Sequence, residues 1–509
     1  MAKRKRSSVP ESTPIAKTGR EVTKKKETTK LKATAKTITE TAKTTRRDSS
    51  ITIQIIAGSY DRVLHGVAAT ISPPSSSSTT SSDEATPEIT FADTFLFNAH
   101  TSAIRCLALS PPSAPLPGQS QKVMLASGST DERINVYNLS AHPPSAKPNP
   151  EAELLSSIAK RPIVEDARNR ELGTLLHHSS TVTQLVFPTR SKLLSASEDS
   201  TIAVTRTRDW SLLSTIKAPV PNVFGRPSGD TAPMGGTPSG VNDFAVHPSM
   251  KVMISVSKGE RCMRLWNLVT GKKAGVLDFG RDMMQDIGEP RHSSGEGRRV
   301  IWGSSKSEGD EFAVGFDRDV LVFGMDSKVR CKVMPDSRTK VHKFAYVQTD
   351  AAEEISTLAV GTEDGRIMFF STATEDLDTE PRADSKTNVP RAKLLAFVGG
   401  KEAGVAGRVK DFKILQPENA PGVWYIVTAS SDGKLRVWEL SAEDIKKPEK
   451  SDSDDNLKPA GKLLGTFETQ NRITCVEAFI MIPRPEGVEE SEEELEDLQD
   501  ESVSDSDDE

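Results

Sequence analysis

A short pattern recurs seven times along this 509-residue chain, and it limits the possible folds more than any other feature of the sequence. Its plainest copy is SSDGKLRVWEL at residues 430–440, where the turn Asp432-Gly433 leads into an alternating run that contains Trp438. In each copy an acidic residue follows a strand-like run rich in small residues, and another strand-like run comes after it. Repetition of one such unit predicts a repeat architecture.

The physical chemistry of one unit predicts a β-hairpin. An acidic side chain in a tight turn accepts hydrogen bonds from nearby backbone N–H groups, and the alternating residues after it form a half-buried strand. The predicted turn residues are Asp61, Asp131, Asp199, Glu260, Asp317, Asp364 and Asp432. Five copies have an aromatic residue six places further on: Tyr137, Trp266, Phe323, Phe370 and Trp438. The other two have Val67 and Thr205 there. We expect both sets to be structural framework.

Further strands precede most of the hairpins. They are predicted at residues 104–110, 182–188, 241–248, 408–415 and 472–480. Before two of them, the runs FLFNAH and GTLLHH end in His100 and His178, which we expect to be structural histidines at the start of a blade. Four short antiparallel strands per unit is the WD40 pattern. The sequence therefore predicts an all-β fold, a seven-bladed WD40 β-propeller with disordered charged termini.

The two ends of the repeat region complement each other. The strand predicted at 472–480 has no hairpin after it, whereas residues 51–97 contain a hairpin with no first strand before it. Together they predict one closing blade, which removes the open edge that a ring of blades would otherwise have. The predicted propeller spans residues 51–482.

Composition predicts disorder on both sides of the propeller and in several loops. Residues 1–47 contain 15 Lys or Arg against 4 Asp or Glu, and residues 484–509 contain 14 Asp or Glu against one Arg. Segments of this kind have too few apolar residues to form a core. We expect a disordered basic head at 1–50 and a disordered acidic tail at 483–509. Disordered loops are predicted at 72–87, 140–170, 219–240, 373–391 and 441–461.

The charged ends have alternative interpretations. The basic clusters of the head act in nuclear import, contact RNA, or only keep the chain soluble. Their residues are Lys3, Arg4, Lys5, Arg6, Lys24, Lys25 and Lys26. Without aromatic residues in the head, base stacking is not available. In the tail, Ser502, Ser504 and Ser506 stand among acidic residues and are candidates for phosphorylation, while the alternative is a plain solubilising tail.

Signatures of catalysis are missing from the sequence. It contains no phosphate-binding G-x-x-x-x-G-K-[ST], no H-E-x-x-H and no G-x-S-x-G. The four cysteines stand far apart, which predicts neither a zinc site nor a disulfide framework and fits a reducing compartment. The N-terminal run MAKRKRSSVP is charged and has no apolar run after it, so we expect no secretory signal, and no apolar stretch approaches the roughly 20 residues needed to cross a bilayer. We expect no catalytic, cofactor or metal residues, no enzymatic activity, no small-molecule substrate and no contact with a membrane.

The sequences of the blades resemble those of one known family. The segments IIAGSYDRVLHGVA, ASGSTDERINVYNL, LLHHSSTVTQLVF, RLWNLVTGK and VTASSDGKLRVWEL are similar, in that order, to the p21-activated-kinase-interacting protein family. Its fungal members are nucleolar WD40 proteins needed for assembly of the large ribosomal subunit. This chain departs from the animal members, because it ends in an acidic segment and has its basic residues at the N-terminus.

The resemblance implies a non-catalytic scaffold in nucleolar assembly of the large (60S) ribosomal subunit and in pre-rRNA maturation. The implied partners are pre-60S assembly factors and ribosomal proteins, with pre-rRNA contacted through the basic head, and the implied location is the nucleus and nucleolus. The alternative that the family name suggests is a negative regulator that binds a p21-activated protein kinase.

Overall fold

The computed structural model describes most of the repeat region and neither charged end. The described residues are 50–73, 88–116, 119–144, 156–158, 161–166, 168–220, 239–289, 294–305, 309–335, 338–347, 357–379, 389–446 and 457–484. The predictions for the basic head up to residue 49 and for the acidic tail from residue 485 lie outside the described residues. So do most of the loops predicted at 72–87 and 219–240.

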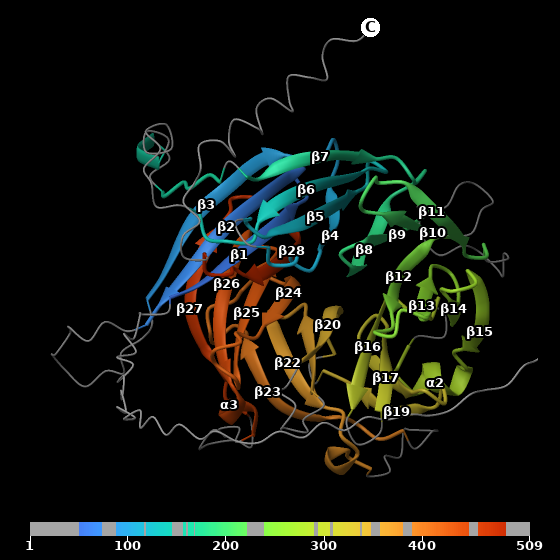
Figure 1. The fold of residues 1–509 in the computed structure, drawn as a ribbon. Coiled ribbons are helices and arrows are strands. Elements are labelled where there is room, and N and C mark those ends of the chain that lie inside the picture. Colours follow the sequence, from blue (N-terminus) through green and yellow to red (C-terminus); the bar gives the residue numbers. More distant parts are fainter. Residues whose placement is uncertain are drawn as a thin grey trace, which may run out of the picture. The chain divides into compact units, whose positions relative to one another are not determined.

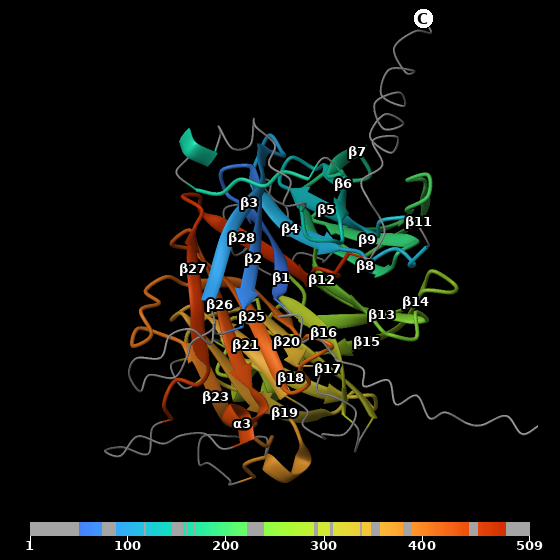
Figure 2. The same ribbon diagram turned by 60° about the vertical axis from the view of Figure 1, so that its left-hand side comes forward.

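Seven four-stranded antiparallel sheets form the blades of a closed β-propeller, as the sequence predicts (Figure 1). Figure 2 shows the same ring turned toward its side. The closing blade contains β28 (Ile473–Ile480), β1 (Ile51–Ser59), β2 (Val63–Ser72) and β3 (Glu88–Asn98).

The other six blades each use four consecutive strands. Blade 1 contains β4 (Ile104–Leu109), β5 (Lys122–Ser129), β6 (Ile134–Ser140) and β7 (Arg170–Leu175). Blade 2 contains β8 (Val182–Thr189), β9 (Lys192–Ser197), β10 (Thr201–Arg206) and β11 (Leu212–Lys217). Blade 3 contains β12 (Val241–Val246), β13 (Val252–Ser257), β14 (Cys262–Asn267) and β15 (Lys272–Asp278). Blade 4 contains β16 (Arg299–Ser305), β17 (Gly309–Gly315), β18 (Val320–Gly324) and β19 (Val329–Val333). Blade 5 contains β20 (Val341–Val347), β21 (Thr357–Thr362), β22 (Arg366–Ser371) and β23 (Lys393–Gly399). Blade 6 contains β24 (Val409–Leu415), β25 (Val423–Ser430), β26 (Lys434–Ser441) and β27 (Lys462–Glu468).

The ring closes by pairing the two ends of the repeat region. Strand β28 lies antiparallel beside β1, with a register that runs from Ile53 opposite Ile480 to Ser59 opposite Ile473. At the turn of the closing blade, the backbone N–H of Arg472 donates to Oδ2 of Asp61 over 3.1 Å. One C-terminal strand therefore completes a sheet of three N-terminal strands and gives β1 a hydrogen-bonded neighbour on each side.

The hydrophobic core lies between blades. Each of seven clusters of buried side chains joins two neighbouring sheets, and Phe412, which is 1% exposed, packs between blades 5 and 6. This arrangement explains a difference from the sequence prediction. The strand after each turn was expected to be half-buried, but β26 is buried along most of its length because a blade covers each of its faces. Outer strands such as β15 are mostly exposed.

Part of the loop that the sequence predicts as disordered over 140–170 is ordered. Residues 161–166 lie along β3, where the N–H of Asp93 donates to the carbonyl of Pro162 (2.9 Å) and the N–H of Val164 donates to the carbonyl of Asp93 (2.8 Å). Asp93 is buried, and it also pairs with His65 at 2.7 Å and with Arg161 at 3.0 Å. The segment is held because it satisfies both the free edge of β3 and a buried carboxylate.

Two further loops were also predicted too broadly. Within 373–391, a 3-10 helix spans Thr374–Asp376, and Asp378 and Arg391 exchange two backbone hydrogen bonds of 2.9 Å. Within 441–461, helix α3 spans Ala442–Lys446 and buries Ile445 among side chains of blades 5 and 6. In each case a few residues find backbone or apolar partners on the neighbouring blades.

One ordered insertion was not predicted. Helix α2 (Arg281–Asp286) follows β15, and Met284 and Ile287 pack into the cluster between blades 3 and 4 together with Phe279. Among the described residues, no helix is long and apolar enough to cross a membrane.

Candidate functional site

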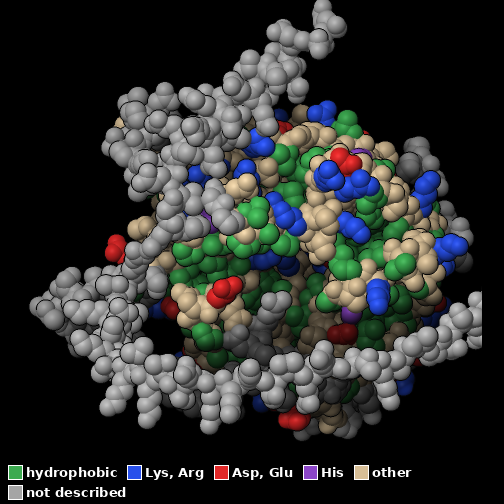
Figure 3. Space-filling model, viewed as in Figure 1, with side chains coloured by type: hydrophobic (Ala, Val, Ile, Leu, Met, Phe, Trp, Pro, Cys, Tyr) green, Lys and Arg blue, Asp and Glu red, His purple; other side chains and the backbone are tan. Residues whose placement is uncertain are grey.

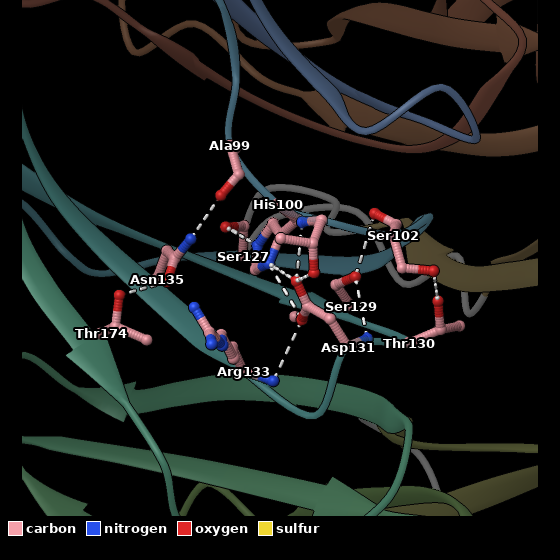
Figure 4. Close-up of polar contacts among 12 residues, drawn as sticks. Ala99, His100, Ser102, Ser127, Ser129, Thr130, Asp131, Arg133, Asn135 and Thr174 are labelled. Carbon is pink, nitrogen blue, oxygen red and sulfur yellow. Dashed lines mark hydrogen bonds and ion pairs between the residues drawn. The ribbon is translucent and has the colours of Figure 1, made fainter.

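The turn of blade 1 carries the fullest polar network of the predicted kind (Figure 4). Ring nitrogen Nδ1 of His100 lies 3.1 Å from Oδ2 of Asp131, and its Nε2 lies 2.8 Å from Oγ of Ser127. Asp131 also accepts the backbone N–H groups of Thr101 (3.0 Å) and Arg133 (3.1 Å). Burial raises the pKa of this carboxyl, but the hydrogen bonds and His100 outweigh it and lower the pKa overall.

Blade 2 repeats the network with the second predicted histidine. His178 lies 3.0 Å from Asp199 through Nδ1 and 2.8 Å from Ser195 through Nε2. The N–H and hydroxyl of Thr201 also donate to Asp199, and these contacts lower the pKa of its carboxyl to about 2 although burial opposes them. The buried hydroxyl of Thr205 stands where other blades have an aromatic ring, and it has no hydrogen-bond partner among the described residues.

In three blades an arginine takes the place of the histidine, which the sequence prediction missed. Glu260 accepts from Nη2 of Arg264 over 2.6 Å, and Asp432 accepts from Nη2 of Arg436 over 2.9 Å. Both arginines stand four places after the turn acid. In blade 5, Asp364 instead accepts from Nε of Arg366 over 2.7 Å. The sequence signal that could have predicted these pairs is an arginine two or four places after the turn acid.

The two remaining turn acids have different partners. Asp61 is exposed and binds the N–H of Arg472, as described above. Asp317 pairs with Arg298 at 3.0 Å and with Lys340 at 3.4 Å.

The predicted aromatic residues are all buried between blades. Tyr137, Trp266, Phe323, Phe370 and Trp438 are each at most 4% exposed. Nε1 of Trp266 donates to Oγ of Ser255 over 2.8 Å. The turn acids, histidines and aromatic rings thus contact one another and the backbone, which is the arrangement of a framework rather than of a catalytic site.

The innermost strands surround a central channel, and in each blade two consecutive residues at or next to the start of the innermost strand define two levels. We call the first level the mouth ring, and its residues are Arg105, Thr183, Asn242, Arg298, His342, Lys410 and Thr474. The residues directly after them form the second ring: Cys106, Gln184, Asp243, Arg299, Lys343, Asp411 and Cys475. In six of the blades the strand register shifts at this point, so the mouth-ring residue is left out of the ladder while the second-ring residue is paired with the neighbouring strand.

Side chains of both rings tie each blade to the next. Oγ1 of Thr183 donates to the carbonyl of Val241 over 2.7 Å, and Nδ2 of Asn242 donates to the carbonyl of Gly297 over 2.9 Å. In the second ring, Asp243 accepts the N–H of Val300 over 3.0 Å.

Asp411 makes the same kind of contact between blade 6 and the closing blade. It accepts the N–H of Val476 over 2.9 Å. The sequence carries this signal as Asp-Phe in both VNDFAV and RVKDFKIL, but spacing alone did not assign it a role.

The channel has charged walls and a cavity of about 300 Å³. Lys343 pairs with Asp411 at 2.5 Å, and Lys413 pairs with Glu477 at 2.8 Å. Burial lowers the pKa of Lys343, but the charges of Asp411 and Glu477 outweigh it and raise the pKa above its ordinary value. Burial also raises the pKa of Asp243 to about 6.

Metal and thiol chemistry find no support in the part of the chain that the structure describes. Within it, no group of three or more His, Cys, Asp or Glu side chains could hold a metal ion. All four cysteines are free and buried, and burial raises the pKa of Cys331 and of Cys475 to about 12. The basic residues from Lys3 to Lys26 and the serines Ser502, Ser504 and Ser506 lie outside the described residues.

Comparison with known proteins supports the WD40 assignment. The family model described as WD domain, G-beta repeat matches residues 92–138 and 169–204, which lie around the first two blades. The chain is also similar to Protein MAK11 of Saccharomyces cerevisiae, with 29% identity over 377 residues that cover 70% of this chain and 71% of that protein. The chain is a WD40-repeat relative of MAK11.

Vertebrate proteins extend this relationship. The p21-activated protein kinase-interacting protein 1-like of Danio rerio is 23% identical over 424 residues, which cover 83% of this chain and 80% of that protein. The protein of the same name from Gallus gallus is 24% identical over 429 residues, covering 84% and 80%. The family resemblance predicted from the blade sequences is thereby confirmed. WD40 propellers are typically non-catalytic scaffolds, and none of these matches indicates an enzyme family.

Proposed function

We propose that this WD40 relative of MAK11 is a non-catalytic scaffold in nucleolar assembly of the large ribosomal subunit. Its proposed partners are pre-60S assembly factors and ribosomal proteins, and its basic head contacts pre-rRNA. The observation that carries the proposal is the similarity to MAK11 over 70% of the chain, because the resemblance implies this role for the fungal members of the family.

The architecture suits such a role. A ring held by seven interblade cores and closed by β28 is rigid, so its loops keep fixed positions relative to one another. The described polar networks at the blade turns are occupied by contacts within a blade and with its leading loop, rather than arranged around a reacting atom. A rigid body with many loops can hold several partners in one geometry, which is what assembly of a large particle requires.

The alternative function is regulation of a kinase. The names of the vertebrate relatives state an interaction with a p21-activated protein kinase, and the chain covers about four fifths of each of them. In this case the same propeller binds the kinase and restrains its activity.

Affinity purification from the native cells separates the two functions. The full-length chain carries a tag, and a second tagged chain without residues 473–480 serves as the control because its ring cannot close. For the proposed function, the full-length chain recovers large-subunit precursor rRNA and assembly factors, and the control does not. Recovery of a p21-activated kinase without precursor rRNA contradicts the assembly role and favours the alternative.

A further inference from the structure

The mouth ring of the channel carries an excess of positive charge. Three of its residues, Arg105, Arg298 and Lys410, are cationic at neutral pH, a fourth is His342, and none of the seven is acidic. Arg298 is occupied by its ion pair with Asp317 outside the channel. Arg105 lines the cavity, and Lys410 directly precedes Asp411, which also lines it. Figure 3 shows Lys and Arg side chains near the hollow in the middle of the ring.

Cationic side chains outnumber carboxylates in the wall of the cavity. Arg105, Arg299, Lys343 and Lys413 line it, against Asp411 and Glu477. Burial raises the pKa of the nearby Asp243, and the charge of Arg299 opposes that rise. Nζ of Lys410 lies 3.5 Å from Nε2 of His342, which is a contact between two basic groups. An excess of cations around a cavity with low-dielectric walls concentrates a positive potential there.

The pKa values of His342 and Lys410 agree with the presence of several cations at the channel mouth. Burial first, and then the charge of Lys410, lower the pKa of His342 to about 4. Burial, followed by the charge of Arg408, lowers the pKa of Lys410. A bound anion would offset both effects, because an opposite charge favours the protonated form.

The surroundings of the mouth limit what kind of anion fits. The turn acids of the blades form an outer circle on the same face, since the loops before the inner strands contact them, as Thr101 contacts Asp131. A nucleic acid lying across this face would bring its phosphates over those carboxylates. A single acidic side chain that enters the centre meets the cations instead, and a cavity of about 300 Å³ has room for one or two side chains.

We do not propose the chain's own acidic tail as the occupant, because the last described residues lie on the side remote from the mouth ring. Strand β28 runs away from the mouth ring, and beyond it the N–H of Ile482 donates to the carbonyl of Ala141 over 2.8 Å. Ala141 follows the end of β6 that is remote from the turn at Asp131. Arg484, the last described residue, lies on that same remote side, where its Nε donates to the carbonyl of Pro143 over 3.2 Å.

From this geometry we propose that the channel mouth is a binding site for acidic side chains, supplied by an extended Asp- or Glu-rich segment of a partner protein. Arg105, Arg299 and Lys410 hold its carboxylates, with Arg105 and Arg299 able to donate two parallel hydrogen bonds each. The site can be tested on the purified protein. The proposal is the same whether the partner is an assembly factor or a kinase.

A binding titration tests this site directly. The full-length protein is titrated into a fluorescein-labelled peptide of twelve alternating Glu and Gly residues, and fluorescence anisotropy is read at low and at physiological salt. We expect saturable binding that weakens at least tenfold in Arg105→Glu and in Lys410→Glu. Lys434→Glu is the matched control, because Lys434 lies on the blade 6 turn of the same face but outside the rings, and it should change the affinity less than twofold.

Three results would overturn the proposal. One is equal loss of affinity in the Lys434 control, or no binding at all to the wild-type protein. Another is tighter binding of a twelve-nucleotide single-stranded RNA through Arg105 and Lys410, which would make nucleic acid the occupant. The third is a tenfold gain in peptide affinity when the 14 acidic residues of 485–509 are changed to Gln or Asn in the full chain, which would make the tail the occupant. Circular dichroism of each variant, and the milder Arg105→Gln, keep a folding defect separate from a binding defect.

Discussion

Substitution of Asp411 tests the contacts in the channel wall most directly, because this side chain contacts three strands. Its Oδ2 accepts the N–H of Val476 in the closing blade, its Oδ1 accepts the N–H of Phe412, and Lys343 of blade 5 lies 2.5 Å away. Asp411→Asn keeps the size of the side chain and removes its charge. The amide can accept only one of the two N–H groups, and Lys343 loses its nearest anion.

The expected loss of stability follows from these contacts. Removing one partner of a buried ion pair costs about 3–5 kcal/mol, and leaving a buried N–H without an acceptor costs about 1–3 kcal/mol. The Lys343 side chain is 23% exposed to the channel, so water compensates part of its charge. Glu477, 4.0 Å from Lys343, compensates more. We therefore expect Asp411→Asn to lower the free energy of unfolding by about 2–4 kcal/mol.

Urea unfolding followed by tryptophan fluorescence measures this loss, since Trp424 and Trp438 lie in the same blade. The matched control is Asp326→Asn, which removes the same charge from an exposed pair with Lys328 and should cost less than about 0.5 kcal/mol. The double variant with Lys343→Met should cost less than the sum of the two single changes. A loss below 1 kcal/mol for Asp411→Asn, or strict additivity in the double variant, would refute the reasoning.

Three other substitutions probe the cores, the second ring and the blade turns. Phe412→Ala empties a fully buried site between two blades and should cost about 3–5 kcal/mol in urea unfolding. Burial raises the pKa of Asp243 to about 6, against 3.8 when unfolded, so the folded state binds this proton more tightly. Protonation of Asp243 therefore stabilises the folded state fully below pH 3.8. This contribution to the free energy of unfolding, about 3 kcal/mol, is lost as the pH rises through 6. Asp243→Asn should remove that part of the pH dependence of stability, and an unchanged pH profile would contradict it. His178→Leu loses the contacts to Ser195 and Asp199 and should cost about 1–3 kcal/mol by thermal unfolding, whereas a neutral effect would show that the network contributes nothing.

The fold could be predicted because each blade carries its own local signal. A turn acid and a following strand recur in all seven copies, and an aromatic residue stands six places on in five of them, so seven copies predict seven blades. The closing pair of β28 and β1 was also accessible, since one segment lacked what the other had. In contrast, the strands after the turns look half-buried in sequence, and only the packing of blades on both faces explains why β26 is buried along most of its length.

The channel and the ordered loops could not be predicted for a physical reason. Arg105 and Arg299 are about 200 residues apart and Lys410 is about 100 further on, and only the circular arrangement of the inner strands brings the first two to one cavity and the third next to it. Arg161 is similar, because its partner Asp93 lies in the edge strand of another blade. Composition predicts how easily a segment could fold alone, but not whether a neighbouring blade offers it partners.

Sedimentation of ribosomal subunits after depletion of the protein tests the proposed function most directly. In sucrose gradients of the native cells, depletion should reduce free large subunits while small subunits persist, and the tagged protein of control cells should sediment with large-subunit precursors. An unchanged subunit profile, with the protein remaining at the top of the gradient, would contradict the role in large-subunit assembly.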